Sequence, residues 1–112
     1  MRHYHIPELD SQRAESTKSY LEFLRTQTLS VGLYVLRAGQ EDLQQPHTED
    51  EVYHVIQGRA RFRAGADDYS VHGGSVLFVE AGLEHRFFEI EEDLTVLVFF
   101  APAEGTAQAP DG

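Results

Sequence analysis

The chain has 112 residues and a formal charge of −10, and 41% of its residues are hydrophobic. This length and composition fit one globular domain and argue against a largely disordered chain. The excess of acidic residues excludes nucleic acid and anionic membrane surfaces as expected partners. Because the chain contains no cysteine, any metal must be bound by histidine, carboxylate or amide groups.

The N-terminal residues 1–17 are polar and contain Pro7. We expect them to form an irregular arm that lies against the rest of the protein. They include no apolar segment of signal-peptide type, and no other stretch has the length and apolar character of a bilayer span. We therefore expect a cytoplasmic protein.

The middle of the chain is a succession of short apolar runs. Residues 20–25 and 29–36 favour strands, although the first range also fits one face of a helix. Further runs follow at residues 51–56, 59–63, 69–71, 75–79, 85–90 and 94–100. Short strands at such even spacing predict an all-β sandwich or barrel. We expect it to span residues 18–102 and expect residues 103–112, rich in Ala, Pro and Gly, to be a disordered tail.

His47 and Glu51 are the first candidate metal ligands. On one straight strand they would lie roughly 13 Å apart, at about 3.3 Å per residue, which is too far for a shared metal ion. A helix would bring them together, but the residues after Glu51 favour a strand. We therefore predict a turn at residues 48–50 that folds Glu51 back towards His47, with Glu49 in solvent.

His85 follows the turn at residues 81–82, and we expect it to reach the same place from another strand. Two imidazoles and one carboxylate form a ligand set that suits divalent Fe, Mn or Zn. His54 comes three residues after Glu51, so on a straight strand it would point to the opposite face. We interpret His54 as a packing or interface residue.

Two segments resemble the two sequence motifs of the cupin superfamily. Residues 39–58 are similar to the first motif, G(x)5HxH(x)3–4E(x)6G, and residues 74–89 to the second, G(x)5PxG(x)2H(x)3N. The likeness covers residues 29–102. It implies an antiparallel double-sheet jelly-roll barrel with a metal site inside, in a small single-domain protein. It also implies a homodimer, for which the N-terminal arm is the candidate contact.

By position, the resemblance implies that His47, Glu51 and His85 bind a divalent metal, which is Fe, Zn, Mn or Ni. Gln45 stands where the family has its first histidine. Its amide is a candidate fourth ligand, a hydrogen-bond partner of the ligands, or neither. The second motif also differs, because Glu80 replaces its proline.

The resemblance leaves three functions open, and the fold does not decide among them. The first is a metal-dependent enzyme, such as a dioxygenase-like oxidoreductase acting on a small oxygenated substrate, because two histidines and one carboxylate leave open positions on the metal. The second is a non-catalytic module that binds a small molecule or senses a metal. The third is a metal-free isomerase or epimerase, which needs an acid/base pair in its pocket. No catalytic residue stands out in the sequence.

Overall fold

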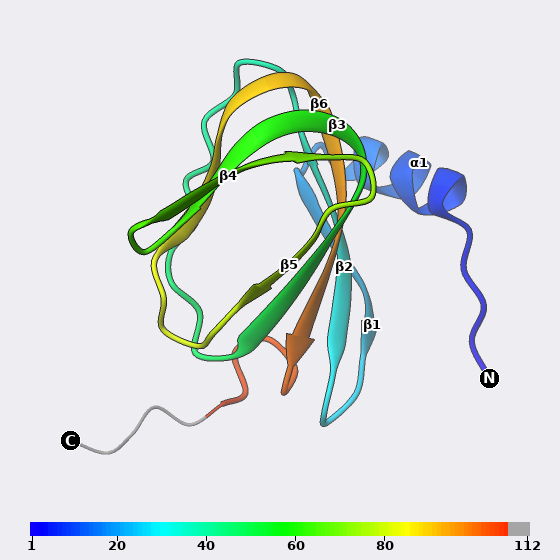
Figure 1. Cartoon of the computed structure of the whole chain (residues 1–112). Coiled ribbons are helices and arrows are strands. Elements are labelled where there is room, and N and C mark those ends of the chain that lie inside the picture. The colour runs from blue at the N-terminus through cyan, green and yellow to red at the C-terminus, as the bar shows by residue number, and fades with distance from the viewer. Residues whose placement is uncertain (108–112) are drawn as a thin grey trace.

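The computed structural model describes residues 1–107. The helix and strands are, in chain order, α1 (Ile6–Ser16), β1 (Tyr20–Arg25), β2 (Ser30–Leu36), β3 (Asp50–Ala64), β4 (Asp67–His72), β5 (Val76–Val79) and β6 (His85–Ala101). Figure 1 shows a strongly curved sheet with α1 on its outside. The all-β fold predicted from the sequence is therefore confirmed.

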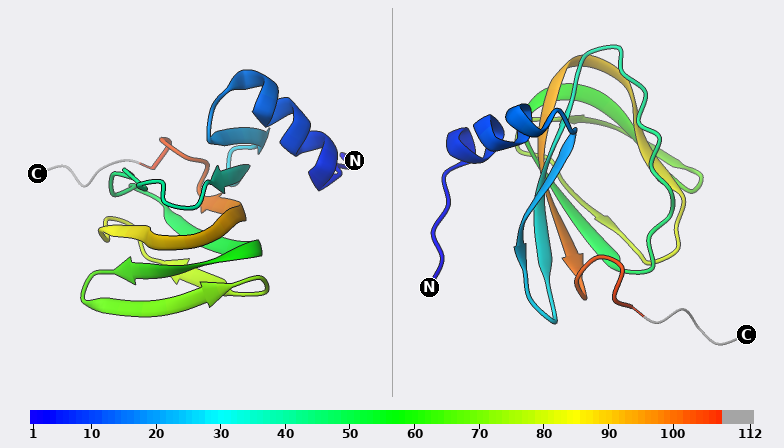
Figure 2. Two further views of the ribbon diagram at one scale, coloured as in Figure 1. Left: turned by 90° about the horizontal axis from the view of Figure 1, so that it is seen from above. Right: turned by 180° about the vertical axis from the view of Figure 1, so that it is seen from behind.

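The strands form one antiparallel sheet in the order β1-β2-β6-β3-β4, and β5 pairs with β3. The sheet curls into an open barrel, and residues 37–49 run along its open side (Figures 1 and 2). Two hydrogen bonds attach this loop to β6, from Gly39 N to Ile90 O at 3.0 Å and from Phe87 N to Asp42 Oδ2 at 2.9 Å. The loop that carries the candidate ligand His47 is thus fixed to the sheet.

The two central strands are longer than the sequence predicted. Residues 51–56 and 59–63 belong to one strand, β3, which continues through Gly58 at a φ of 102°. A Cβ atom at this position would lie 2.4 Å from Asp93 O. Only glycine adopts this conformation readily and permits so close an approach. The strand passes the Gln57-Gly58 position by an irregular register against β6, and so does not end there.

The N-terminal region also differs from the expected irregular arm, because it contains helix α1. Pro7 lies in the first turn of the helix, where its missing N–H removes no intrahelical bond. Leu9 and Arg13 are buried, and Arg13 donates a 3.0 Å hydrogen bond to Lys18 O. Within residues 1–107, no helix has the length and apolar character needed to cross a membrane.

The C-terminal residues 103–107 lie against the barrel, although the sequence analysis placed them in a disordered tail. Ala103 is fully buried, and Glu104 N donates a hydrogen bond of 2.9 Å to Ser30 Oγ. The remainder of that expected tail, residues 108–112, lies outside the described residues.

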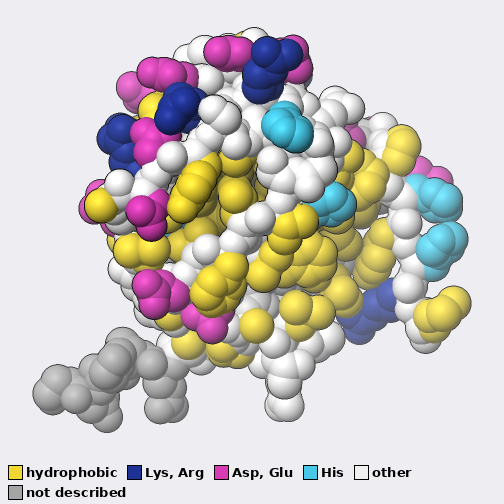
Figure 3. Space-filling model, viewed as in Figure 1, with side chains coloured by type: hydrophobic (Ala, Val, Ile, Leu, Met, Phe, Trp, Pro, Cys, Tyr) yellow, Lys and Arg dark blue, Asp and Glu magenta, His cyan; other side chains and the backbone are white. Residues whose placement is uncertain are grey.

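The hydrophobic core fills the barrel from the inward faces of β3 and β6. The rings of Phe62 and Phe87 pack with centroids 4.8 Å apart, and Tyr53 packs on Phe87 at 5.4 Å. Figure 3 shows hydrophobic side chains gathered across the middle of one face and charged side chains along its upper edge. The candidate ligands Glu51 and His85 lie on the same two strands as this core, so packing fixes their positions.

Candidate metal centre

Three separate parts of the chain bring the predicted ligands together. His47 lies near the end of the loop of residues 37–49, Glu51 is the second residue of β3, and His85 is the first residue of β6. A bend at residues 48–49 turns the chain between His47 and Glu51, as the spacing argument required. One ligand atom from each of the three residues lies within 4.8 Å of the other two.

Glu51 lies between the two imidazoles. Its Oε1 atom is 2.6 Å from His47 Nδ1 and 3.4 Å from His85 Nε2. The side chains of Glu51 and His85 are each 1% exposed, whereas that of His47 is 21% exposed. The site is therefore closed towards the core and open on the side of His47.

Two buried polar atoms of this cluster lack a hydrogen-bond partner among residues 1–107. They are His47 Nδ1 and Glu51 Oε2, and the short contact of His47 with Glu51 does not have hydrogen-bond geometry. Unpaired buried polar atoms are rare and cost about 1–3 kcal/mol each. A cation between them would remove this cost, and two nitrogens with one carboxylate suit a divalent transition metal. The residues present therefore fit a metal.

Hydrogen bonds on both sides of the ring fix the orientation of His85. Its Nδ1 donates to Leu83 O at 2.8 Å, and its Nε2 lies 2.9 Å from the Tyr53 hydroxyl. That hydroxyl donates its own proton to Gln44 Oε1 at 2.9 Å. Because Leu83 O can only accept a hydrogen bond, Nδ1 of His85 carries a proton. Nε2 is then the nitrogen that would bind a metal, with the bond to Leu83 left in place.

The electrostatics of the site follow from this arrangement. Burial opposes ionisation of Glu51, but contacts with both histidines and with the Tyr53 hydroxyl outweigh it and lower its pKa to about 2. Contact with Glu51 is the largest effect on His47 and raises its pKa, whereas burial opposes the rise. Burial lowers the pKa of His85, but Glu51 and the Leu83 carbonyl raise it overall. The site thus holds an ionised carboxylate between two imidazoles that protonate readily.

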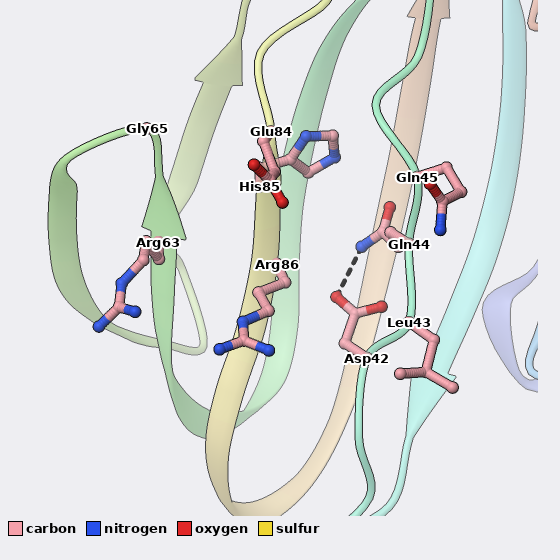
Figure 4. A pocket seen from close by; sticks show the side chains of 9 residues that line it. All are labelled: Asp42, Leu43, Gln44, Gln45, Arg63, Gly65, Glu84, His85 and Arg86. Atoms are coloured by element: carbon pink, nitrogen blue, oxygen red, sulfur yellow. Dashed lines mark hydrogen bonds between the residues drawn. The ribbon is translucent and has the colours of Figure 1, made fainter.

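Gln45, the other candidate ligand, is exposed. Figure 4 shows it on the loop, across the pocket from the strand that carries His85. Its neighbour Gln44 makes the contact with the core, through the Tyr53 hydroxyl. A role of Gln45 as a metal ligand stays a prediction.

Two cavities lie beside the site and share Gln44 and Gln45 in their walls. One, of about 490 Å³, extends from His85 to Arg63 and Arg86 (Figure 4). The other, of about 200 Å³, is lined by His47 and by aromatic and aliphatic side chains that include Phe100. Each cavity therefore adjoins one of the histidines and offers space for a small molecule.

Sequence reasoning missed three acidic residues that shape the site, namely Asp42, Glu49 and Glu104. Glu49 was expected in solvent but is 1% exposed. Its carboxylate accepts the backbone N–H groups of Gly105 and Ala107 at 3.0 and 3.1 Å. The partners of Glu49 lie far along the chain, so no local pattern indicated its burial. His54 is exposed and Glu51 is buried, so the two lie on opposite faces of β3, as their spacing predicted; a role of His54 at an interface stays a prediction.

Asp42 connects the loop to the site. Its buried carboxylate accepts hydrogen bonds from Tyr34 Oη and Gln44 Nε2, both at 2.7 Å, and from Phe87 N at 2.9 Å. We predict that Asp42→Ala lowers the free energy of unfolding by roughly 2–3 kcal/mol, because it leaves buried donors unpaired. Urea denaturation measures this loss.

Asp42→Asn is the matched control for this prediction. Its amide oxygen can still accept from Gln44 Nε2 and Phe87 N, and its NH2 group can donate to the Tyr34 hydroxyl oxygen, so we expect a smaller loss of stability than in Asp42→Ala. A change below about 0.5 kcal/mol in Asp42→Ala would be typical of a neutral surface site and would contradict this role.

The sequence profile of the cupin domain matches residues 32–100. This protein belongs to the cupin family. An uncharacterized protein of Streptomyces coelicolor, SCO3923, is 48% identical to this cupin over 104 residues, which are 93% of this chain and 99% of that protein.

Solved structures share the cupin fold. A match to an RmlC-like cupin with a double-stranded β-helix fold from Methanocaldococcus jannaschii covers 74% of this chain and 78% of that one, with a TM-score of 0.68 and 15% identity. A match in crystal structures of DMSP lyases covers 74% of this chain and 43% of that one, with a TM-score of 0.65 and 26% identity. The predicted jelly-roll architecture is therefore confirmed.

Proposed function

We propose that this cupin binds a divalent transition metal through His47, Glu51 and His85 and acts through it on a small oxygenated molecule. The observation that carries the proposal is the pair of buried, unpartnered atoms, His47 Nδ1 and Glu51 Oε2. Three protein ligands leave positions on a metal open for a substrate. A bound metal would supply Lewis-acid or redox chemistry.

The residues around the site have separate roles in this proposal. Glu51 contributes the one negative charge among the three ligands, and its low pKa keeps it ionised. The Leu83 carbonyl orients His85 through Nδ1, and the Tyr53 hydroxyl lies 2.9 Å from the Nε2 atom that would bind the metal. The cavity beside His47 receives the substrate. The likeness to a chain described as a DMSP lyase supports a catalytic role.

A metal-free isomerase or epimerase is the competing proposal, because His85 and the Tyr53 hydroxyl lie 2.9 Å apart and could form an acid/base pair. Burial argues against it. Tyr53 has no exposed surface, and His85 is only 4% exposed. Tyr53 lines neither of the two cavities beside the site, whereas His85 lines one of them, so a substrate could reach only one member of this pair.

Titration of the metal-free protein with Co²⁺ tests the proposed function. We expect visible absorption bands of a protein-bound Co²⁺ ion, and we expect oxalate, a small bidentate oxygen ligand, to change these bands by entering the open positions. The Glu51→Gln variant should show much weaker bands, because it loses the carboxylate ligand.

The outcomes of the Co²⁺ and oxalate titrations distinguish the competing functions. No Co²⁺ bands in the wild-type protein would contradict metal binding and favour metal-free chemistry. Bands that oxalate leaves unchanged would indicate a closed site, as in a storage or sensor module. With Fe²⁺ bound, oxygen uptake in the presence of a substrate would support the dioxygenase-like form of the proposal.

A further inference from the structure

The C-terminal segment, residues 102–107, brings an additional carboxylate to the candidate metal centre. Glu104 Oε2 lies 3.1 Å from His47 Nε2, and the Glu104 side chain is 36% exposed. Glu104 also lines the cavity of about 200 Å³ beside His47. Its carboxylate therefore stands where the imidazole of His47 meets the cavity.

Hydrogen bonds to its backbone hold this segment in place. Glu104 N donates to Ser30 Oγ at 2.9 Å, and Glu104 O accepts from Arg25 at 2.6 and 3.1 Å. The next residues are held by buried Glu49, which accepts the N–H groups of Gly105 and Ala107. Because the backbone of Glu104 is bound through both its N–H and its carbonyl group, the residue is held at a position from which its side chain reaches His47.

The two nitrogens of His47 consequently face different carboxylates. Nδ1 faces Glu51 Oε1 at 2.6 Å, on the side of His85, and Nε2 faces Glu104 Oε2. The three groups that converge within 4.8 Å of one another are His47, Glu51 and His85, without Glu104. Glu104 therefore does not share the centre formed by these ligands, although it touches one of them.

We propose that Glu104 is a positioning residue that accepts the Nε2 proton of His47 and thereby presents Nδ1 to the metal. A histidine ligand commonly donates its second N–H to a carboxylate, which fixes its tautomer and orientation. This inference rests on the proposed metal binding, and it specifies which ring nitrogen of each histidine would bind the metal. His47 binds through Nδ1, whereas His85 binds through Nε2, because Nδ1 of His85 is bonded to Leu83.

Nitrogen-15 NMR of the histidine rings in the zinc-loaded protein tests which nitrogen of His47 binds the metal. We expect His47 to carry a proton on Nε2 and to bind zinc through Nδ1. A proton on Nδ1 and zinc on Nε2 would overturn this inference while leaving metal binding intact. Absence of bound zinc would overturn the proposed metal centre and this inference with it.

Metal affinity in variants tests the role of Glu104. We expect Glu104→Ala to weaken Zn²⁺ binding about 10–100-fold, as loss of a partner behind a metal ligand usually does. Glu104→Gln should recover part of the affinity, because its amide oxygen can still accept the Nε2 proton. Glu91→Gln is the matched control, because Glu91 is exposed and pairs with Arg59 on the barrel surface.

The same variants show whether the effect is local. All of them should preserve the circular-dichroism spectrum of the wild-type protein, and zinc-bound Glu104→Ala should lose the defined Nε2–H signal of His47. Equal affinities of Glu104→Ala and the wild-type protein would overturn the proposal.

Discussion

Replacement of Phe87 by alanine is expected to lower the free energy of unfolding by about 3–5 kcal/mol, the usual cost of removing a buried phenyl ring. Phe87 is 1% exposed and packs against the rings of Phe62 and Tyr53. Both neighbours lie on β3, the strand that pairs with β6, and Phe62 is directly opposite Phe87 in the register of the two strands. The strands cannot close easily over the space left by the ring, so a cavity should remain.

The Phe87→Ala substitution should also change the candidate metal centre. Tyr53, one of the rings that pack on Phe87, places its hydroxyl 2.9 Å from His85 Nε2. Loss of the Phe87 ring should allow Tyr53 to shift and should weaken metal binding. Urea denaturation of the metal-free protein separates the loss of stability from the loss of metal affinity.

Phe78→Ala provides the control for core packing. Phe78 lies on β5 with 65% of its surface exposed, and we expect its removal to change stability by less than about 0.5 kcal/mol. Similar losses in Phe87→Ala and Phe78→Ala would show that the packing inside the barrel is not as described.

The sequence predicted the strands well where local pattern controls them. Short apolar runs separated by glycine and acidic turns produced the antiparallel barrel, and the spacing of His47 and Glu51 required a bend between them. Strand length could not be predicted in the same way. Gln57-Gly58 has the composition of a turn, but the strand continues through it. Gly58 is needed there because the backbone oxygen of Asp93 lies too close for a Cβ atom.

The surroundings of the site depend on contacts between distant residues, so the sequence did not reveal them. Glu49 has the composition of an exposed turn residue and is buried because it binds the backbone of residues 105 and 107. Glu104 lies in a segment rich in Ala and Gly, a composition typical of flexible tails. Its position beside His47 follows from the path of the chain after β6.

The metal content of the purified protein tests most directly whether His47, Glu51 and His85 form one metal centre. Each histidine supplies one of the three ligands, and loss of one leaves a buried carboxylate with a single imidazole. Two ligands hold a divalent metal far more weakly than three. We therefore expect His47→Ala and His85→Ala to lose bound metal while remaining folded.

The matched control is His72→Ala, which removes an exposed histidine at the end of β4, away from the site. After purification without added metal, elemental analysis should find about one equivalent of a divalent metal in the wild-type protein and in His72→Ala. It should find little in His47→Ala or His85→Ala, with circular-dichroism spectra unchanged. Equal metal content in all four proteins would contradict the metal centre described here.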